Sequence, residues 1–422
     1  MEKKSISAKW AFRYFLASLF ILLLLGTPQN NTNATAKSLP KLGARGADVL
    51  RRVFGDQFVA DLEAVVYNTL DKVNQERYLL GLKQAEAPWQ LTSPTPNVIV
   101  QPADTSQPTI VSTPTPTTVV VADATPPPTS IAQSTPTPPW KPQNIKAFTK
   151  KAGEGEWGSY LKDSKGNTIA YRTFVSPDLK RPYVSVGIVA FDLRQSKLNF
   201  LLGFDEPRAT LPISNTRLNR TGRIPSEDAK IKRLLAAFNG GFKSQHGNFG
   251  VMISNTVMLP PRDGFATVAL QKDGAVQIGA WGRDIKTSAD YMAWRQNGPP
   301  ILENGKINPL TNEMTAANWG AALDGTVAVW RSALGINKDN TVLYYAAGDG
   351  VVLPTMAEAL LAAGADDAMQ LDINNYWVHF TAVRDTGGKL TPEPLFDGMK
   401  NQDPNRFLGA YSRDFFYVVL KE

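Results

Sequence analysis

Cysteine is absent from this chain of 422 residues, and histidine is nearly so, with only His246 and His379. The first absence excludes disulfide bonds, thiolate metal sites and a cysteine nucleophile. The second excludes a zinc site built from three histidines and leaves a Ser-His-Asp triad at most two candidate bases. His246, in a glycine-flanked loop, is either a surface histidine or one that reaches into a site, and His379 is expected to be structural.

Long runs of positive charge are also missing. The net charge is +7 and the pI is about 9.3, but the lysines and arginines are scattered and do not alternate with aromatic residues. No nucleic-acid partner is therefore predicted. A mildly basic surface suits anionic material of the cell envelope as well.

The N-terminus combines basic residues with a short apolar run, Tyr14–Leu25. This pattern is typical of a secretory signal, and an uncleaved membrane anchor is the alternative. The run is shorter than the roughly 20 apolar residues that a membrane span needs. Residues 1–36 are thus predicted to be a signal peptide or an anchor in contact with the membrane, with Ala34–Ala36 as the candidate cleavage site. The protein is expected to be exported, secreted or membrane-anchored, with its main domain outside the cytoplasm.

Two accessory segments precede the main domain. Residues 40–86 are predicted to be helical, because apolar residues recur there at spacings of three and four. This segment could be a stalk for self-association, or it could pack on itself. Residues 87–144 contain repeats such as TPTP and TPPP, and glycine is absent from Lys83 to Ala152. Proline without glycine gives an extended, semi-rigid spacer, predicted here to be a disordered linker.

Residues 145–422 are predicted to form one α+β domain with a mixed β-sheet. Apolar runs separated by turn signals predict its strands. The predicted strands are Thr168–Val175, Tyr183–Leu193, Leu198–Leu202, Thr326–Trp330 and Phe415–Leu420, with a hairpin over Gly264–Gly279. A helix is expected over Ser226–Leu235, where Ser226 can cap it and acidic residues fall in the first turn.

The segment Thr341–Trp377 is predicted to be a strand–helix–strand unit. Thr341–Ala347 and Ala368–Leu371 are short apolar runs, and the residues between them favour a helix. Thr355 is expected to begin this helix with a capping box, and Gly364 sits where a C-terminal glycine belongs. A unit of this length implies parallel strands, whose carboxyl ends lie on one edge of the sheet.

Polar residues follow several of the predicted strands. Asp349 and Asp372 come at the ends of the two parallel strands, on the rim where open α/β sheets bind ligands. Asn239-Gly240-Gly241 ends an apolar run, and paired glycines permit positive φ and let a backbone approach a ligand closely. Arg331, after a strand, could clamp a phosphodiester. The plainer alternatives are turn aspartates, a tight Asn-Gly turn and a surface ion pair.

Three separated pieces, in this order, resemble the phosphodiester glycosidase family. They are AAFNGGF (236–242), WRSALGI (330–336) and GDGVVLPTMAEALLAAGADDAMQLD (348–372), and the similarity spans about residues 155–422. The family shows LDGGGS where this chain has LDINNYW (371–377), so the aspartate is retained while three glycines and a serine are replaced. Bulkier residues in that loop should narrow or reshape the pocket.

The resemblance implies hydrolysis of a glycosidic bond to a phosphodiester, with a carbohydrate or sugar phosphate as substrate or a cell-envelope polymer as partner. Asp349 and Asp372 would be the catalytic carboxylates, acting as base or nucleophile and as acid. The residues expected to bind the substrate are Asn239, Gly240, Gly241, Arg331, Asn374, Asn375 and Trp377. No cofactor or metal site is predicted, although the two aspartates could hold a divalent cation through oxygen.

Two alternatives stay open. The lost glycines and the long spacer favour a non-catalytic envelope protein that binds glycans and is displayed on a Pro/Thr-rich stalk. Hydrolysis of a different exopolysaccharide or cell-wall linkage is the other alternative. Binding of wall glycans without turnover would favour the first of these over either hydrolase.

Overall fold

The computed structural model describes residues 56–89, 140–210, 218, 220–312, 325–373 and 375–421. The predicted signal or anchor and nearly all of the predicted linker lie outside these residues, as does Asn374. The chain divides into one compact unit of Met1–Gln90 with Trp140–Glu422 and a second of Leu91–Pro139, which is not described. Among the described residues, no helix is long and apolar enough to cross a membrane.

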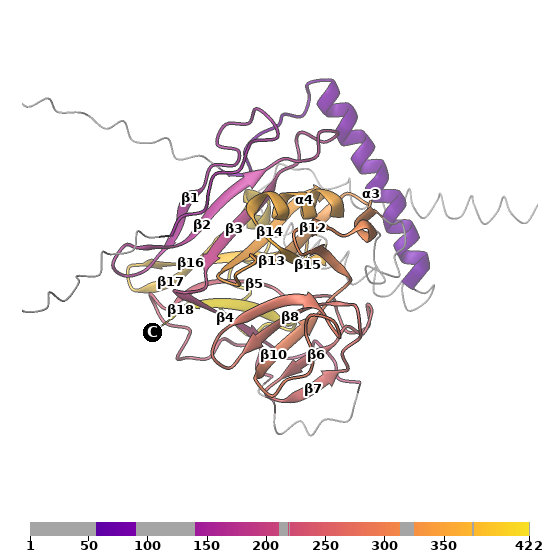
Figure 1. Cartoon of the computed structure of the whole chain (residues 1–422). Coiled ribbons are helices and arrows are strands. Elements are labelled where there is room, and N and C mark those ends of the chain that lie inside the picture. The colour runs from indigo at the N-terminus through magenta and orange to yellow at the C-terminus, as the bar shows by residue number, and fades with distance from the viewer. Residues whose placement is uncertain are drawn as a thin grey trace, which may run out of the picture. The chain divides into compact units, whose positions relative to one another are not determined.

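An eight-stranded sheet is the largest element of the domain (Figure 1). Every neighbouring pair in it is antiparallel. In spatial order its strands are β1 (Gly158–Lys162), β2 (Thr168–Val175), β3 (Val186–Asp192), β14 (Val342–Val351), β13 (Val329–Ile336), β15 (Asp367–Ile373), β11 (Pro300–Glu303) and β12 (Lys306–Ile307).

Two five-stranded antiparallel sheets complete the β structure. The first contains β17 (Lys389–Pro394), β16 (Phe380–Thr386), β5 (Leu234–Asn239), β18 (Phe415–Leu420) and β4 (Ser196–Leu201) in spatial order. The second contains β7 (Thr256–Leu259), β6 (Val251–Ile253), β10 (Tyr291–Gln296), β8 (Ala266–Gln271) and β9 (Val276–Ala280). Short 3-10 helices follow β12 (η2, Pro309–Asn312) and β17 (η4, Asp397–Asn401).

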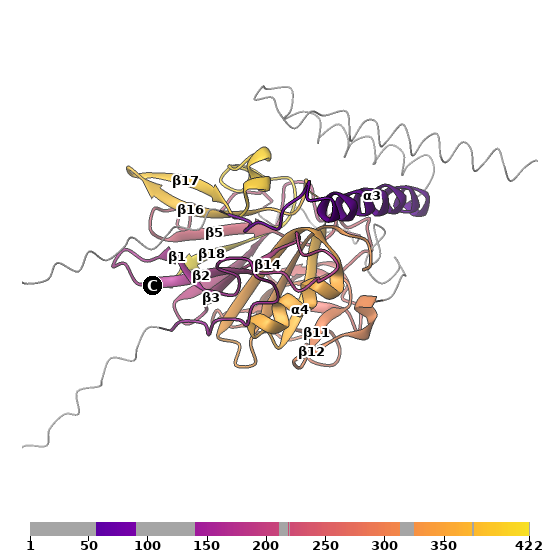
Figure 2. The same ribbon diagram turned by 90° about the horizontal axis from the view of Figure 1, so that it is seen from above.

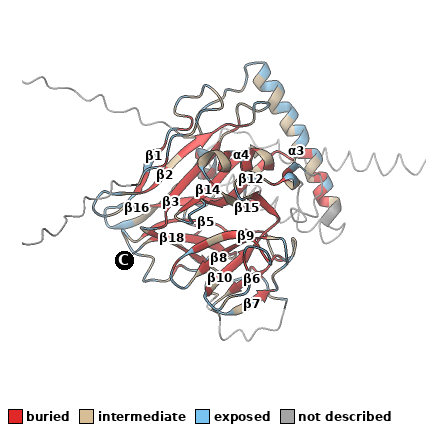
Figure 3. Ribbon diagram, in the orientation of Figure 1, coloured by how far each residue is buried: buried red, intermediate tan, exposed pale blue. Residues whose placement is uncertain are grey.

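The main core lies between the large sheet and the two smaller ones, because its apolar side chains come from strands of all three sheets. At its centre Phe238, Tyr345 and Phe380 form a close aromatic group, with ring centroids 4.8–6.1 Å apart. The other face of the large sheet is covered by α4 (Leu353–Ala363), which forms a second core with β3, β13 and β14 (Figures 1 and 2). Figure 3 shows these strands as buried along most of their length. A mostly β domain with two described α-helices, α3 and α4, confirms the predicted α+β class.

The predicted strand–helix–strand unit is present as β14, α4 and β15. Both strands are antiparallel to β13, which lies between them, so they are parallel to each other. Gly364 ends α4 in the left-handed conformation, at φ 99°, as expected. The predicted capping box is wrong, because α4 begins before Thr355 and Val352 is its N-cap, without a side-chain hydrogen bond. Proline in the first turn fits this start, since its missing N–H would have no helical partner there.

The helix predicted over Ser226–Leu235 is also wrong. The chain forms successive turns there, and Leu234 already begins strand β5. Lys232 has a positive φ of 64°, which no α-helix accommodates. Strand β5 is buried at every position, because β16 and β18 flank it on both sides. Tertiary pairing therefore overrides the local helix signal.

Helix α3 (Asp56–Leu79) packs on the domain rather than on itself. Its Asp71 accepts two hydrogen bonds from Arg181, at 2.8 and 2.6 Å. The Lys83 ammonium lies 4.5 Å from the centre of the Tyr183 ring, a cation–π contact. Ala64 and Tyr67 of α3 pack against a cluster from the sheet edges that includes Phe242 and Ile373. Most of the solvent-facing side of α3 is exposed (Figure 3).

Candidate functional site

Both predicted catalytic aspartates lie in β-bulges, and the two bulges flank Arg331. On β14, Asp349 and Gly350 together face the single residue Trp330 of β13. On β15, Leu371 and Asp372 together face Ser332 of the same strand. Bulges bend a strand and redirect its side chains, and they are common beside active sites. The predicted common edge is thus present, although Arg331 lies inside β13 and not after its end.

Asp372 is buried and forms an ion pair with Arg413. Its Oδ2 is 2.5 Å from the Arg413 Nη2, and only 4 % of the residue is exposed. Its Oδ1 accepts a hydrogen bond of 2.8 Å from the backbone N–H of Ile373. Burial raises the pKa of the Asp372 carboxyl above its usual value, and the Arg413 guanidinium opposes that rise. The carboxyl is therefore held in one orientation, and burial and the Arg413 guanidinium act on its pKa in opposite directions.

Arg413 joins three regions that are far apart in the sequence. Besides Asp372, its Nη2 donates to the Gly241 carbonyl at 2.7 Å, and its guanidinium carbon lies 4.3 Å from the centre of the Trp377 ring. The sequence pattern shows this arginine only as a residue before the closing strand. No local sequence signal identifies its role, because Arg413 reaches the Asn-Gly-Gly turn only through the pairing of Phe415 in β18 with Asn239 in β5.

Asn239 is connected to the backbone of Asp372 through Ser332. The Asn239 amide donates to the Ser332 hydroxyl at 2.9 Å, and that hydroxyl donates to the Asp372 carbonyl at 3.0 Å. The Asn239 carbonyl oxygen accepts from the Tyr345 hydroxyl and from the backbone N–H of His379, both at 3.1 Å. Asn239 is 4 % exposed, so its polar atoms link the strands of two sheets.

The glycines of the Asn-Gly-Gly turn are required by the protein's own packing. A Cβ atom on Gly240 would lie 2.6 Å from Oδ2 of Asp414, and one on Gly241 would lie 3.1 Å from the guanidinium carbon of Arg295. Asp414 and Arg295 form a buried ion pair of 2.8 Å behind the turn. Neither glycine has a positive φ, so the conformational freedom expected from the sequence is not used.

Arg331 and Asp349 have surroundings different from those expected. Arg331 is fully buried, and its guanidinium donates to the carbonyls of Val351 and Val327 and to the side chain of Gln370, at 2.7–2.9 Å. This geometry corrects the expected phosphate clamp, because these donors are directed to acceptors inside the sheet. Asp349, in contrast, has an exposed side chain. Its surroundings nevertheless desolvate the carboxyl and raise its pKa above the usual value, and the charge of Lys83, just beyond α3, opposes that rise.

The divergent loop after Asp372 places two aromatic rings beside cations. Tyr376 and Trp377 are half-buried, with ring centroids 4.4 Å apart. The Lys243 ammonium lies 5.1 Å from the Trp377 ring, in addition to the Arg413 contact. Arg406 lies 5.5 Å from the Tyr376 ring. Cations favour the faces of aromatic rings, so this rim carries positive charge held by aromatic side chains.

The remaining members of this loop differ in exposure. Asn375 is exposed, and its carbonyl accepts a hydrogen bond from Gln402. Asn374 lies outside the described residues. His379 is fully buried, its Nε2 lies 3.0 Å from the Thr381 hydroxyl, and burial lowers its pKa well below the usual value. Within the described ranges, no group of three or more histidines and acidic residues is arranged to hold a metal ion.

The comparisons with known proteins agree with the resemblance inferred from the motifs. A family model described as phosphodiester glycosidase matches residues 232–372, which include the Asn-Gly-Gly turn, Arg331 and both rim aspartates. The resemblance is thus confirmed over this segment. No curated protein matches the chain.

Three solved structures are similar to the chain at low identity. The catalytic domain of zebrafish N-acetylglucosamine-1-phosphodiester alpha-N-acetylglucosaminidase, auto-inhibited by its pro-peptide, is 14% identical, with a TM-score of 0.37 over 63% of this chain and 88% of that one. A hypothetical protein from Synechocystis is 12% identical, with a TM-score of 0.31 over 63% and 62%. A putative exported protein from Burkholderia pseudomallei is 10% identical, with a TM-score of 0.27 over 56% and 74%.

Proposed function

We propose that this protein is an exported glycosidase that hydrolyses the bond between a sugar and a phosphodiester, or a related linkage in an envelope glycan. The match to the phosphodiester glycosidase family supports the glycosidase chemistry. The observation that carries the proposal is the buried pair of Asp372 and Arg413, which joins the bulge at the end of β15 to the Asn-Gly-Gly turn and the divergent loop. The N-terminal apolar run supports export.

In this proposal Asp372 is the acid–base carboxyl. A pKa raised by burial suits a carboxyl that must exchange a proton near neutral pH. Water attacks the anomeric carbon and loses a proton to a carboxylate, while the bond from that carbon to the phosphate oxygen breaks and the phosphate, now a monoester of the remaining alcohol, leaves as an anion. Such a leaving group needs less protonation than a sugar alcohol, so one strong acid can be dispensed with.

We infer an inverting mechanism from the spacing of the strands that carry Asp349 and Asp372. Its strand is separated from that of Asp372 by β13, so the two backbones lie about 10 Å apart, two strand spacings. Retaining enzymes hold their carboxyls roughly 5–5.5 Å apart, and inverting enzymes use a wider gap that admits water. The phosphate is assigned to the rim beside Trp377 where Lys243 lies, since Arg331 is fully buried and Arg406 is also buried.

The test is the release of free sugar from a sugar-1-phosphodiester by the purified full chain. Asp372→Asn should lower the rate at least about a hundredfold, the usual scale of acid–base catalysis. Asp385→Asn, on the exposed end of β16, is the matched control and should keep the rate. If the wild type is active and Asp372→Asn releases sugar at the same rate, Asp372 has no role in the mechanism.

A second candidate is a non-catalytic glycan-binding protein displayed on the Pro/Thr-rich spacer. The burial of Asn239 and Arg331, together with the paired rings of Tyr376 and Trp377, favours it, because aromatic rings stack on sugars without chemistry. Tight binding of wall glycans with no turnover across a panel of sugar phosphodiesters would select this candidate over the hydrolase.

A further inference from the structure

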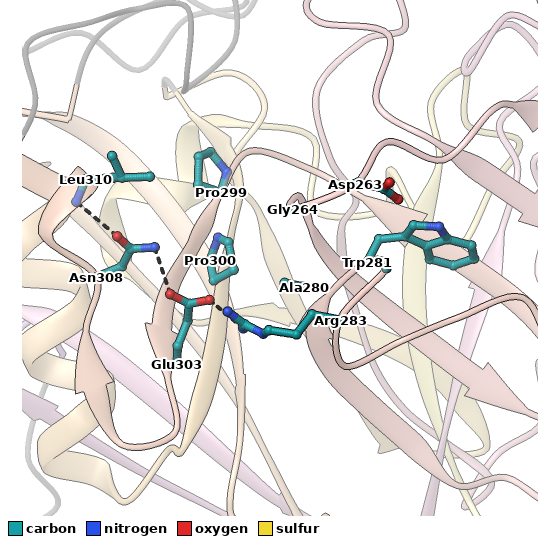
Figure 4. A pocket seen from close by; sticks show the side chains of 11 residues that line it. Asp263, Gly264, Ala280, Trp281, Arg283, Pro299, Pro300, Glu303, Asn308 and Leu310 are labelled. Atoms are coloured by element: carbon teal, nitrogen blue, oxygen red, sulfur yellow. Dashed lines mark hydrogen bonds and ion pairs between the residues drawn. The ribbon is translucent and has the colours of Figure 1, made fainter.

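A cavity of about 460 Å³ opens between strand β11 with the segment that follows β12 and the end of β9 with the loops around it (Figure 4). It lies apart from the residues around Asp372, and none of the residues predicted to act on or bind a substrate lines it. Its volume is within the roughly 300–1,000 Å³ that small-molecule sites occupy. Its walls include Asp263, Trp281, Arg283, Pro300, Glu303 and Asn308.

One wall is a fixed row of polar groups. Arg283 and Glu303 form an ion pair with 2.6 Å between Nη2 and Oε1. The other Glu303 oxygen accepts from the Asn308 amide at 3.1 Å, and the Asn308 carbonyl oxygen accepts from the backbone N–H of Leu310 at 3.0 Å. Figure 4 shows the side chains of Asn308, Glu303 and Arg283 in one line along this wall. Hydrogen bonds therefore position Glu303 and Asn308 before any ligand arrives, whereas Arg283 pairs with Glu303 from an exposed position.

Another part of the wall is apolar. Pro299 and Pro300 form one apolar side, whereas the far end has both the Trp281 indole and the Asp263 carboxylate (Figure 4). An apolar surface opposite a few fixed polar groups is the usual composition of a small-ligand site. A sugar ring presents the same two aspects, with C–H groups on its faces and hydroxyls at its edges.

The charges at this cavity argue against an anionic ligand. Two carboxylates, Asp263 and Glu303, line it with one guanidinium, Arg283, which also pairs with Asp284 at 2.7 Å. A phosphate would be repelled by this excess of negative charge. Hydroxyl groups suit it, because carboxylates accept hydrogen bonds from them and a guanidinium donates to them. The chemistry therefore fits a neutral sugar unit.

The cavity wall is tied to the strand that carries Asp372. Pro300 pairs with Met369 of β15. The nearby Asn297 amide donates to the carbonyls of Gln370 and Leu371, at 2.8 and 2.7 Å. Met369 lies three positions before Asp372, so this wall is about 10 Å along the strand from the backbone of the candidate acid–base residue. One glycan chain could reach both places.

We propose that this cavity is a second carbohydrate subsite, which binds a neutral sugar of the same glycan that reacts at Asp372. The substrate is then an oligosaccharide or polymer with a phosphodiester-linked unit, and not a single sugar phosphate. This assignment of substrate class rests on the proposed hydrolase function. The binding of neutral oligosaccharide by the cavity does not, and it is measured separately.

The experiment measures binding by calorimetry with the full chain. The probes are neutral tetrasaccharides of glucose, mannose, galactose and N-acetylglucosamine, with polyphosphate as the anionic probe. The wild-type chain is the background, because none of these probes carries the sugar-to-phosphate bond that the proposed hydrolase cleaves. Glu303→Gln, which nearly preserves shape, and Arg283→Ala should each weaken binding about tenfold, the scale of a lost hydrogen bond to a charged group. Arg223→Ala removes an exposed arginine elsewhere and is the matched control.

The outcomes separate the two proposals. Binding of at least one tetrasaccharide, weakened by both cavity variants but not by the control, supports the subsite. If none of the tetrasaccharides binds, if the cavity variants bind like the control, or if polyphosphate binds there instead, the subsite is refuted. If binding behaves as expected but the wild type hydrolyses no sugar phosphodiester, the proposed function fails and the binding site stands.

Discussion

Removing the Arg413 guanidinium is the most direct perturbation of the candidate site. Arg413→Met keeps much of the side-chain volume but leaves the Asp372 carboxylate buried without its 2.5 Å partner. Breaking a buried ion pair from one side costs about 3–5 kcal/mol, most of it from the stranded charge. We therefore expect the free energy of unfolding of Arg413→Met to fall by about that amount at neutral pH.

The pH dependence of this cost has a definite sign. Without Arg413 nothing opposes the effect of burial, so the pKa of Asp372 should rise further above its usual value. Lowering the pH then neutralises the stranded carboxylate in the folded variant. The destabilisation relative to the wild type should accordingly shrink as the pH is lowered from neutral to acidic.

A double-mutant cycle in denaturant checks this reasoning. Asp372→Asn alone leaves a buried guanidinium, whereas the double variant leaves no net charge at the site. The double variant should therefore be more stable than the sum of the single effects implies, by more than 1 kcal/mol or so. Effects that add to within about 0.5 kcal/mol would refute a strong buried ion pair. A loss of unfolding free energy in Arg413→Met that does not change with pH would also refute it.

Two further changes test the surroundings of the site. Below about pH 6.5 the unfolded chain should bind a proton at His379 that the folded chain does not, because burial lowers the folded-state pKa. Stability should fall by up to about 1.4 kcal/mol per pH unit as the pH decreases, and His379→Gln should reduce that slope, measured by urea unfolding at a series of pH values. Gly240→Ala should destabilise by about 1–3 kcal/mol, since its Cβ would meet Asp414. Gly409→Ala should leave the stability unchanged, because the space around its Cβ is open. Equal unfolding midpoints for the two variants would contradict the packing argument.

The strands were the most predictable part of the fold. Thr168–Val175 and Phe415–Leu420 have the bounds expected from their β-branched and aromatic residues. The hairpin over β8 and β9 was expected from its central turn residues, and both strands formed. The helix over Ser226–Leu235 failed because its last residues are needed in β5, where partners distant in sequence pair with it on both sides. Local propensity carries no information about such partners.

The candidate site was predictable only as a list of positions. The shared edge of Asp349 and Asp372 followed from the strand–helix–strand order, and it is present. The bulges were not expected, because they depend on the register between β13 and its two neighbours. Arg331 was expected to face a ligand, yet the bulges leave it enclosed between them. Arg413 was missed, since its role comes from pairing between β5 and β18, which are separated by most of the domain.

The divergent loop acquires a physical role from these contacts. Trp377 supplies an aromatic face for the guanidinium of Arg413, which lies 4.3 Å from the centre of that ring and also binds Asp372. The ring also lies near Lys243, so it supports two cations at once. The contact with the Trp377 ring restricts the position of the Arg413 guanidinium. The positive charge of that guanidinium opposes the rise in the pKa of Asp372. Trp377 therefore affects the electrostatics of the retained aspartate as well as the shape of the rim.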